Sequence, residues 1–202
     1  MYIHQGIDFG VHMIRGVVSE LRQEFSSLQQ FSSLSPIPQF RKWLVQRLAE
    51  ADHPTAVFLP CEVARLVEGL KVSEADLHGE LTKLFGGSNK WLTDQGLVDV
   101  LKDPLVRLCA VYLYSVKRRG YAYDPVANFH LRNGATLWRL NWLGDTTAKG
   151  CNQSFGIMVN YRYYLEHMEE RSTTYVLEKR LSASSQVLQL LDGNSTATSS
   201  KL

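Results

Sequence analysis

A long block of helix-like sequence separates two strand-like segments in this chain of 202 residues. The first segment, "FSSLS" at 31–35, is followed by two prolines, which cannot donate hydrogen bonds to a sheet. The second segment, "ATLWRLNWL" at 135–143, alternates in side-chain character with both faces partly apolar, which favours a central strand. Because strands lie at both ends and helices lie between them, the sequence predicts a single mixed α/β domain.

Apolar residues at helical spacing predict most of the remaining elements. The expected helices are 12–25, 39–51, 60–70, 73–85, 94–102, 103–118, 124–131 and 174–191. Pro104 suits a first helical turn, and the cations at 117–119 suit the C-terminal end of the same helix. Asp124 is a suitable N-cap for helix 124–131, and Gly134 suits its left-handed exit. Segment 154–165 is expected to be a strand, or a strand that runs into a helix.

The composition excludes several classes of function. A formal net charge of +2 gives no general electrostatic reason to bind nucleic acid or a membrane surface, so an anion site has to be local. The longest apolar run, at 108–114, is far shorter than the roughly 20 residues that cross a bilayer. Three widely spaced cysteines fit reduced thiols, and no Cys/His pair has zinc spacing. We therefore expect no metal, no cofactor, no nucleic acid and no membrane partner.

The two ends of the chain carry different signals. Residues 192–202 form a polar, Ser/Thr-rich tail of the kind that stays disordered. The tail ends in Ser200-Lys201-Leu202, which matches the peroxisomal address and predicts an import receptor as a partner and the peroxisomal matrix as a location. At the other end, "QGIDFG" follows Met1 so closely that the chain is expected to be a fragment.

Two segments near the N-terminus could carry chemistry. "QGIDFG" reads as a glycine-bounded loop that runs into a helix, where free backbone N–H groups bind phosphate; the alternative is a simple turn. Arg15, one turn into that helix, could pair with the anion or lie in solvent. "FSSLSPIP" holds three serines, and Ser35 lies at a strand end before a proline. Ordinary edge hydroxyls are the alternative there, and the chain has no G-x-S-x-G elbow.

Two further segments hold titratable or hydroxyl side chains that suit either packing or a site. His130 lies about one turn before Gly134, and taken alone it fits a packed residue better than a catalyst. "NYRYYL" at 160–165 places Tyr161, Tyr163 and Tyr164 where they could line a site or simply pack. Local sequence does not choose between these alternatives.

Taken together, these segments resemble one family. "QGIDFG", "FSSLSPIPQFRKWL", the long string from Asp103 to Asp145, "NYRYYL" and the terminal "SKL" are similar to the catalytic region of malonyl-CoA decarboxylases. The similarity runs in order from Gln5 to Leu202.

The resemblance implies a GNAT-type acyl-CoA-binding fold that is N-terminally truncated, with a helical insertion between its strands. It implies a partial catalytic domain over 1–191, without its first strands, followed by the tail 192–202. The implied reaction converts malonyl-CoA to acetyl-CoA and CO2 in fatty-acid metabolism, with no cofactor.

The resemblance also assigns site residues. Ser35 and His130 correspond to the catalytic pair, His130 as the acid that protonates C2, and Tyr163 is a further member. The acyl-CoA-binding loop corresponds to Gln5, Gly6, Ile7, Asp8, Phe9, Gly10 and Val11. Asp8 occupies the first glycine position of the GNAT signature.

Two alternative functions stay open at this stage: an acyl-CoA acyltransferase of the same fold, and an inactive fragment that only binds acyl-CoA. Association of identical chains into a homo-oligomer is open as well. A mitochondrial or cytoplasmic pool is also open for a longer form.

Overall fold

The computed structural model describes residues 5–192, with side chains from Met13 onward. The predicted peroxisomal address and nearly all of the polar tail therefore lie outside the described residues. The helices are α1 (Gln5–Glu24), α2 (Phe40–Ala49), α3 (Pro60–Leu70), α4 (Glu74–Gly86), α5 (Gln95–Ser115), α6 (Pro125–Arg132), α7 (Ala148–Ser154), α8 (Met168–Glu178) and α9 (Ser185–Leu191). The strands are β1 (Phe31–Ser35), β2 (Lys117–Arg118), β3 (Tyr121–Ala122), β4 (Thr136–Asn141) and β5 (Met158–Tyr163). Short 3-10 helices span Pro54–Ala56, Asn89–Thr93 and Leu165–His167.

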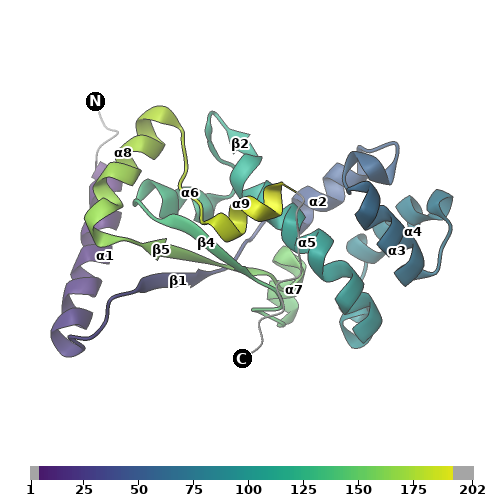
Figure 1. Cartoon of the computed structure of the whole chain (residues 1–202), viewed down its shortest axis with the longest axis horizontal. Helices are drawn as coiled ribbons and strands as arrows, with labels where there is room; N and C mark the ends of the chain where they lie inside the picture. Colours follow the sequence, from purple (N-terminus) through teal and green to yellow (C-terminus); the bar gives the residue numbers. More distant parts are fainter. Residues whose placement is uncertain (1–4, 193–202) are drawn as a thin grey trace.

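An antiparallel three-stranded sheet of order β1-β5-β4 is the centre of the fold. Helices α2 to α5 follow β1 in the chain and lie toward and beyond one end of the sheet, while α1 and α8 lie at its opposite end (Figure 1). Strand β5 brings Tyr161 and Tyr163 beside β1, since Ser33 pairs with Tyr161 and Phe31 with Tyr163. The mixed α/β class predicted from the sequence is confirmed.

Strand β4 is not the central strand that its sequence predicts, because β5 lies between it and β1. The outer edge of β4 is nevertheless covered. The amide of Leu137 donates to the carbonyl of Ser182 (2.9 Å), and the amide of Ser184 donates to the carbonyl of Leu137 (3.0 Å). This cover explains why a strand at the end of the sheet order has the apolar pattern of an inner one.

The pairing of residues 182–184 with β4 interrupts the helix that was predicted over 174–191. Helix α8 ends at Glu178, the following Lys179 has a left-handed φ of 61°, and Ala183 forms a parallel bridge with Leu137. Ser184 then caps α9 by accepting from the amide of Val187 (3.2 Å). Sheet pairing therefore outweighs the helical periodicity of this segment.

Two other predicted boundaries are wrong. Helix α5 runs unbroken through Pro104, where two helices were expected. An interior proline costs about 3 kcal/mol, but Pro104 is buried with Leu101 and Leu105, and this packing opposes the cost. The cations at 117–119 do not end this helix; they belong to the β2–β3 hairpin, whose turn has positive φ at Arg119 and Gly120.

The loop predicted at "QGIDFG" is helical in the structure. Helix α1 begins at Gln5, so the positions from Gln5 to Val11 lie inside its first turns and do not precede it. An isolated glycine costs a helix only about 1 kcal/mol relative to alanine, so Gly6 and Gly10 are too weak a signal to keep the segment open.

None of the helices within residues 5–192 combines the length and the apolar character needed to cross a membrane.

Candidate active site

Strand β1 positions two serines on one side of the sheet. Successive side chains of a strand alternate between faces, so Ser33 and Ser35 share a face with Val159 and Tyr161, their register partners on β5. Pro36 follows immediately and the strand ends at Ser35. Ser35 is only 5% exposed, and its Oγ lies 2.9 Å from Oγ of Ser33.

Helix α6 carries the histidine. Its start is fixed by the buried Asp124, whose Oδ1 accepts from the amides of Val126 and Ala127 (both 3.0 Å). Its exit is fixed by Gly134, which has a φ of 77°; a Cβ there would lie 2.0 Å from the carbonyl oxygen of Met168. The cap and the exit predicted from the sequence are confirmed, and together they hold His130 in place.

Ser35, His130 and Tyr163 form one hydrogen-bonded line, which we call the Ser–His–Tyr line. Nε2 of His130 lies 3.0 Å from Oγ of Ser35, and Nδ1 lies 2.6 Å from Oη of Tyr163. The imidazole also stacks on the ring of Tyr161, with centroids 4.4 Å apart and an angle of 16° between planes. Three residues from three elements, far apart in the sequence, therefore meet with both imidazole nitrogens engaged.

Burial sets the protonation of this line. It lowers the pKa of His130 to about 4 and raises the pKa of Tyr163, because a low-dielectric environment disfavours the charged form of either group. Near neutral pH, His130 is therefore a neutral imidazole beside a neutral phenol. A neutral imidazole carries one N–H, so it donates to one neighbour and accepts from the other.

The low pKa of His130 predicts acid sensitivity of the fold. The unfolded chain regains the ordinary value of 6.5, so between pH 6.5 and about pH 4 it binds more protons than the folded chain. Stability is thus fully present above pH 6.5 and is lost as the pH falls. This one group should remove about 2 kcal/mol of unfolding free energy between pH 7 and pH 5.

Urea unfolding at both pH values measures this loss. His130→Gln has no such titration and should lose correspondingly less, whereas His167→Gln, at an exposed histidine, should behave as the wild type. An equal loss in the wild type and in His130→Gln would contradict the assignment.

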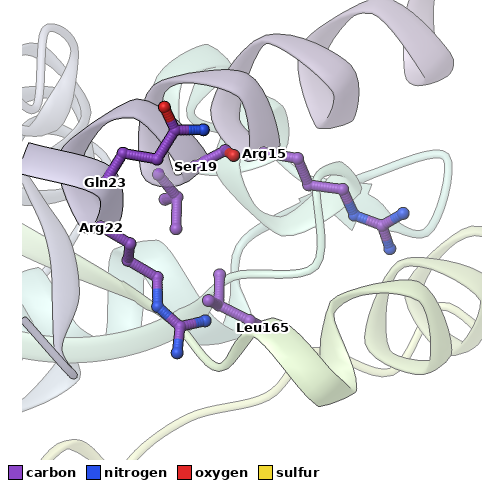
Figure 2. Close-up of a pocket in the computed structure, with 6 residues that line it drawn as sticks. Arg15, Ser19, Arg22, Gln23 and Leu165 are labelled. Carbon is purple, nitrogen blue, oxygen red and sulfur yellow. The ribbon is translucent and has the colours of Figure 1, made fainter. Parts of the chain in front are cut away.

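The side chains from Gln5 to Val11, predicted as the acyl-CoA-binding loop, lie outside the part of the chain whose side chains the structure describes. Arg15, considered above as an anion partner, lies 3.7 Å from the carboxylate of Glu169. It lines a hollow along α1 together with Arg22 and Leu165, and the two guanidinium groups point in different directions (Figure 2). Ser35 and His130 are not among the residues that line this hollow.

A second hollow, of about 370 Å³, connects this region to the site. It shares Arg22 and Leu165 with the first hollow and is also lined by Tyr163. The tyrosine end of the Ser–His–Tyr line is therefore the end that borders a hollow next to α1.

The sequence assigned no role to two residues that contact the Ser–His–Tyr line, Tyr161 and Ser33. Tyr161 was expected to line a site or to pack, and its stacking on His130 could not be foreseen without the register of β5. Ser33 was noted only as one of three serines; its position two residues before Ser35 is the signal that places both hydroxyls on one face. Among the residues that the structure describes, no group of three or more His, Cys, Asp and Glu is arranged to hold a metal ion.

The fold and the site define a mixed α/β domain with a buried serine–histidine–tyrosine line. The model of the malonyl-CoA decarboxylase C-terminal domain family matches residues 3–201. The chain is 45% identical to the mitochondrial malonyl-CoA decarboxylases of Mus musculus, over 192 residues, and of Anser anser anser, over 190 residues. Each alignment covers 93% of this chain. The chain belongs to the malonyl-CoA decarboxylase C-terminal domain family.

Solved structures agree with this assignment. The malonyl-CoA decarboxylase of Rhodopseudomonas palustris superimposes with a TM-score of 0.71 at 35% identity, covering 92% of this chain and 38% of the other. The enzyme from Agrobacterium vitis gives a TM-score of 0.71 at 33% identity, covering 92% and 41%. The chain spans 38% and 37% of the length of the mouse and goose relatives.

Proposed function

We propose that this chain carries the catalytic site of a malonyl-CoA decarboxylase, a carboxy-lyase that converts malonyl-CoA to acetyl-CoA and CO2. The observation that carries the proposal is the Ser–His–Tyr line, in which His130 lies 3.0 Å from Ser35 and 2.6 Å from Tyr163. Family membership supports the reaction, since the relatives named above are malonyl-CoA decarboxylases.

In this reaction the bond between C2 and the carboxylate carbon breaks, and its electron pair moves onto C2 and the thioester oxygen. Donors aimed at that oxygen stabilise the transition state more than the substrate. We assign the hydroxyl of Ser35 to this role or to holding the departing carboxylate. Its second contact, with Oγ of Ser33, keeps it oriented when the substrate is bound.

C2 of the enolate then needs a proton, and we assign its delivery to His130. A neutral imidazole is a poor acid, but the malonyl carboxylate beside it favours the charged form, so substrate binding raises its pKa and loads a proton from solvent. Once CO2 has left, that proton moves to C2 and His130 is neutral again. Tyr163, held neutral by burial, keeps the ring oriented through Nδ1.

We further propose that the domain over 1–191 has a GNAT-type fold that binds the acyl-CoA through the 5–11 segment. In that case the contacts come from the first turns of α1, where the backbone of this segment lies. The terminal Ser200-Lys201-Leu202 supports recognition by a peroxisomal import receptor. The mitochondrial names of the curated relatives support a mitochondrial pool for a longer form.

The direct test incubates the purified chain with malonyl-CoA and follows acetyl-CoA and CO2. Ser35→Ala should lower kcat about 10²–10³-fold, the usual cost of removing one oxyanion-hole donor. Ser32→Ala is the matched control, because Ser32 is exposed on the other face of the same strand and should keep wild-type activity.

The same assay distinguishes decarboxylation from the two alternative functions. Product that forms only when an amine or thiol acceptor is added would indicate an acyltransferase instead. Acyl-CoA binding without turnover, in a chain that remains folded, would mean that this chain keeps binding alone.

A further inference from the structure

A further cavity, distinct from the two hollows beside α1, lies on the face of the sheet opposite the Ser–His–Tyr line. Thr136 on β4 is in register with Arg162 on β5, so both face away from the neighbouring Tyr161 and Tyr163. The cavity, of about 440 Å³, is lined by Thr136, Trp138, Tyr164, Arg171 and the 182–186 segment. We call it the β4–α9 cavity. It includes none of Ser35, His130 and Tyr163 among its lining residues, and it shares Tyr164 with the hollow beside Tyr163.

Arg171 lines this cavity, and Arg162, which lines the hollow beside Tyr163 instead, stacks on two of its aromatic lining residues. The guanidinium carbon of Arg162 lies 4.5 Å from the ring centroid of Trp138 and 4.6 Å from that of Tyr164. The guanidinium carbon of Arg171 lies 4.4 Å from the centroid of Tyr164. Aromatic faces hold each planar cation while leaving its N–H edges available, because stacking uses the face of the guanidinium.

The charge of Arg171, the arginine that lines the cavity, is not balanced by an acidic lining residue. Within residues 5–192, with side chains from Met13 onward, neither Arg162 nor Arg171 is in an ion pair. Arg171 donates one hydrogen bond, from NH1 to Oγ1 of Thr136 (2.9 Å), out of the five N–H donors that a guanidinium has. The residues that line the cavity include no Asp or Glu. The wall is thus rich in donors and positively charged.

Hydroxyl and amide groups complete the lining. Ser182, Ser184, Ser185 and Gln186 come from the segment that covers the edge of β4. Ser184 is engaged, since its Oγ donates to the carbonyl of Trp138 (2.6 Å), whereas Ser185 is exposed. A guanidinium fork with neighbouring hydroxyl donors matches a phosphate group, which accepts two parallel N–H bonds from arginine.

We propose that the β4–α9 cavity binds a phosphomonoester group, with Arg171 as its main ligand. Such a group comes either from a free phosphate ester or from the 3′-phosphate of a coenzyme A nucleotide. The proposal stands on this cavity alone and does not depend on whether the chain decarboxylates malonyl-CoA.

Isothermal titration calorimetry with inorganic phosphate tests this proposal. The ionic strength is held constant with chloride, so that the screening of electrostatic interactions does not change. The wild type should give saturable binding. Arg171→Gln should weaken binding at least about tenfold, the loss expected when a charge-assisted bidentate contact is removed. Arg47→Gln removes the same charge from an exposed site on α2 and should bind within about twofold of the wild type.

A second variant covers the case in which Arg171→Gln fails to fold. Ser185→Asp places a carboxylate at the cavity, and an acidic residue in the first turn of α9 is favourable for the helix. Like charge should then abolish phosphate binding in a folded chain. Unchanged binding in Ser185→Asp, or a wild type that shows only non-saturable heat, would overturn the proposal.

Competition identifies the source of the group. Coenzyme A carries the 3′-phosphomonoester and dephospho-coenzyme A lacks it. Displacement of inorganic phosphate by the former alone supports the nucleotide as the source. Displacement by neither supports a free phosphate ester.

Discussion

Replacing His130 with glutamine should lower the rate of acetyl-CoA formation about 10²–10⁴-fold, the range that a positioned general acid contributes. Glutamine has a similar length and can keep hydrogen bonds to Ser35 and Tyr163, but it cannot carry the proton that C2 requires. The stacking partner, Tyr161, is fully buried and remains in place, so we expect the fold to survive. The loss should appear in kcat more than in KM, because the missing step follows substrate binding.

The measurement combines single-turnover kinetics with isotope incorporation. In heavy water the wild type should place one deuterium at C2 of the acetyl-CoA that it forms, and His130→Gln should do so at the reduced rate. His167→Gln is the control, since it removes an exposed imidazole and should retain full activity. A folded His130→Gln chain that turns over at the wild-type rate would remove His130 from the mechanism.

Elements bounded by local signals could be predicted from the sequence. Strand β1 and helix α3 have the predicted bounds. Pro36 directly follows β1, and Pro60 is the first residue of α3. The Asp124 cap of α6 was likewise visible in the sequence. The failures at Pro104 and over 174–191 share a cause: tertiary contacts outweigh the local preference there, and no local pattern reports them.

The candidate site also depends on tertiary contacts that no local sequence pattern reports. Ser35 and His130 are separated by 95 positions, and the local sequence favoured packing for His130. Only the family resemblance paired the two residues, and in the structure their side chains lie 3.0 Å apart.

Arg41 is a second example, because its sequence predicted only that it belongs to an ordinary helix. It is buried and donates to the carbonyls of Phe85, Gly87 and Cys151, contacts that depend on how distant loops pack.

Replacing Arg107 with methionine should lower the free energy of unfolding by about 3–5 kcal/mol, the cost of leaving one member of a buried ion pair without its partner. Nε of Arg107 lies 2.7 Å from Oε1 of Glu62, and its NH2 lies 2.7 Å from Oε2, a bidentate contact that joins α5 to α3. Both side chains are under 10% exposed, at 9% and 4%, so water cannot replace the lost contact. Glu62 also accepts from the amide of Leu59 at the start of α3 (2.9 Å).

Urea unfolding of matched variants separates burial from charge. Arg65→Met breaks an ion pair between the same two helices, but that pair, with Asp103 at 3.1 Å, is half exposed and should cost at most about 1 kcal/mol. Adding Glu62→Gln to Arg107→Met removes the stranded carboxylate while keeping an oxygen for Leu59, and should restore at least about half of the loss. Equal losses in Arg107→Met and Arg65→Met would show that burial does not set the cost. Recovery in the double variant would show that the loss comes from the uncompensated charge of Glu62. Changing Glu62 cannot restore the packing that is lost with Arg107.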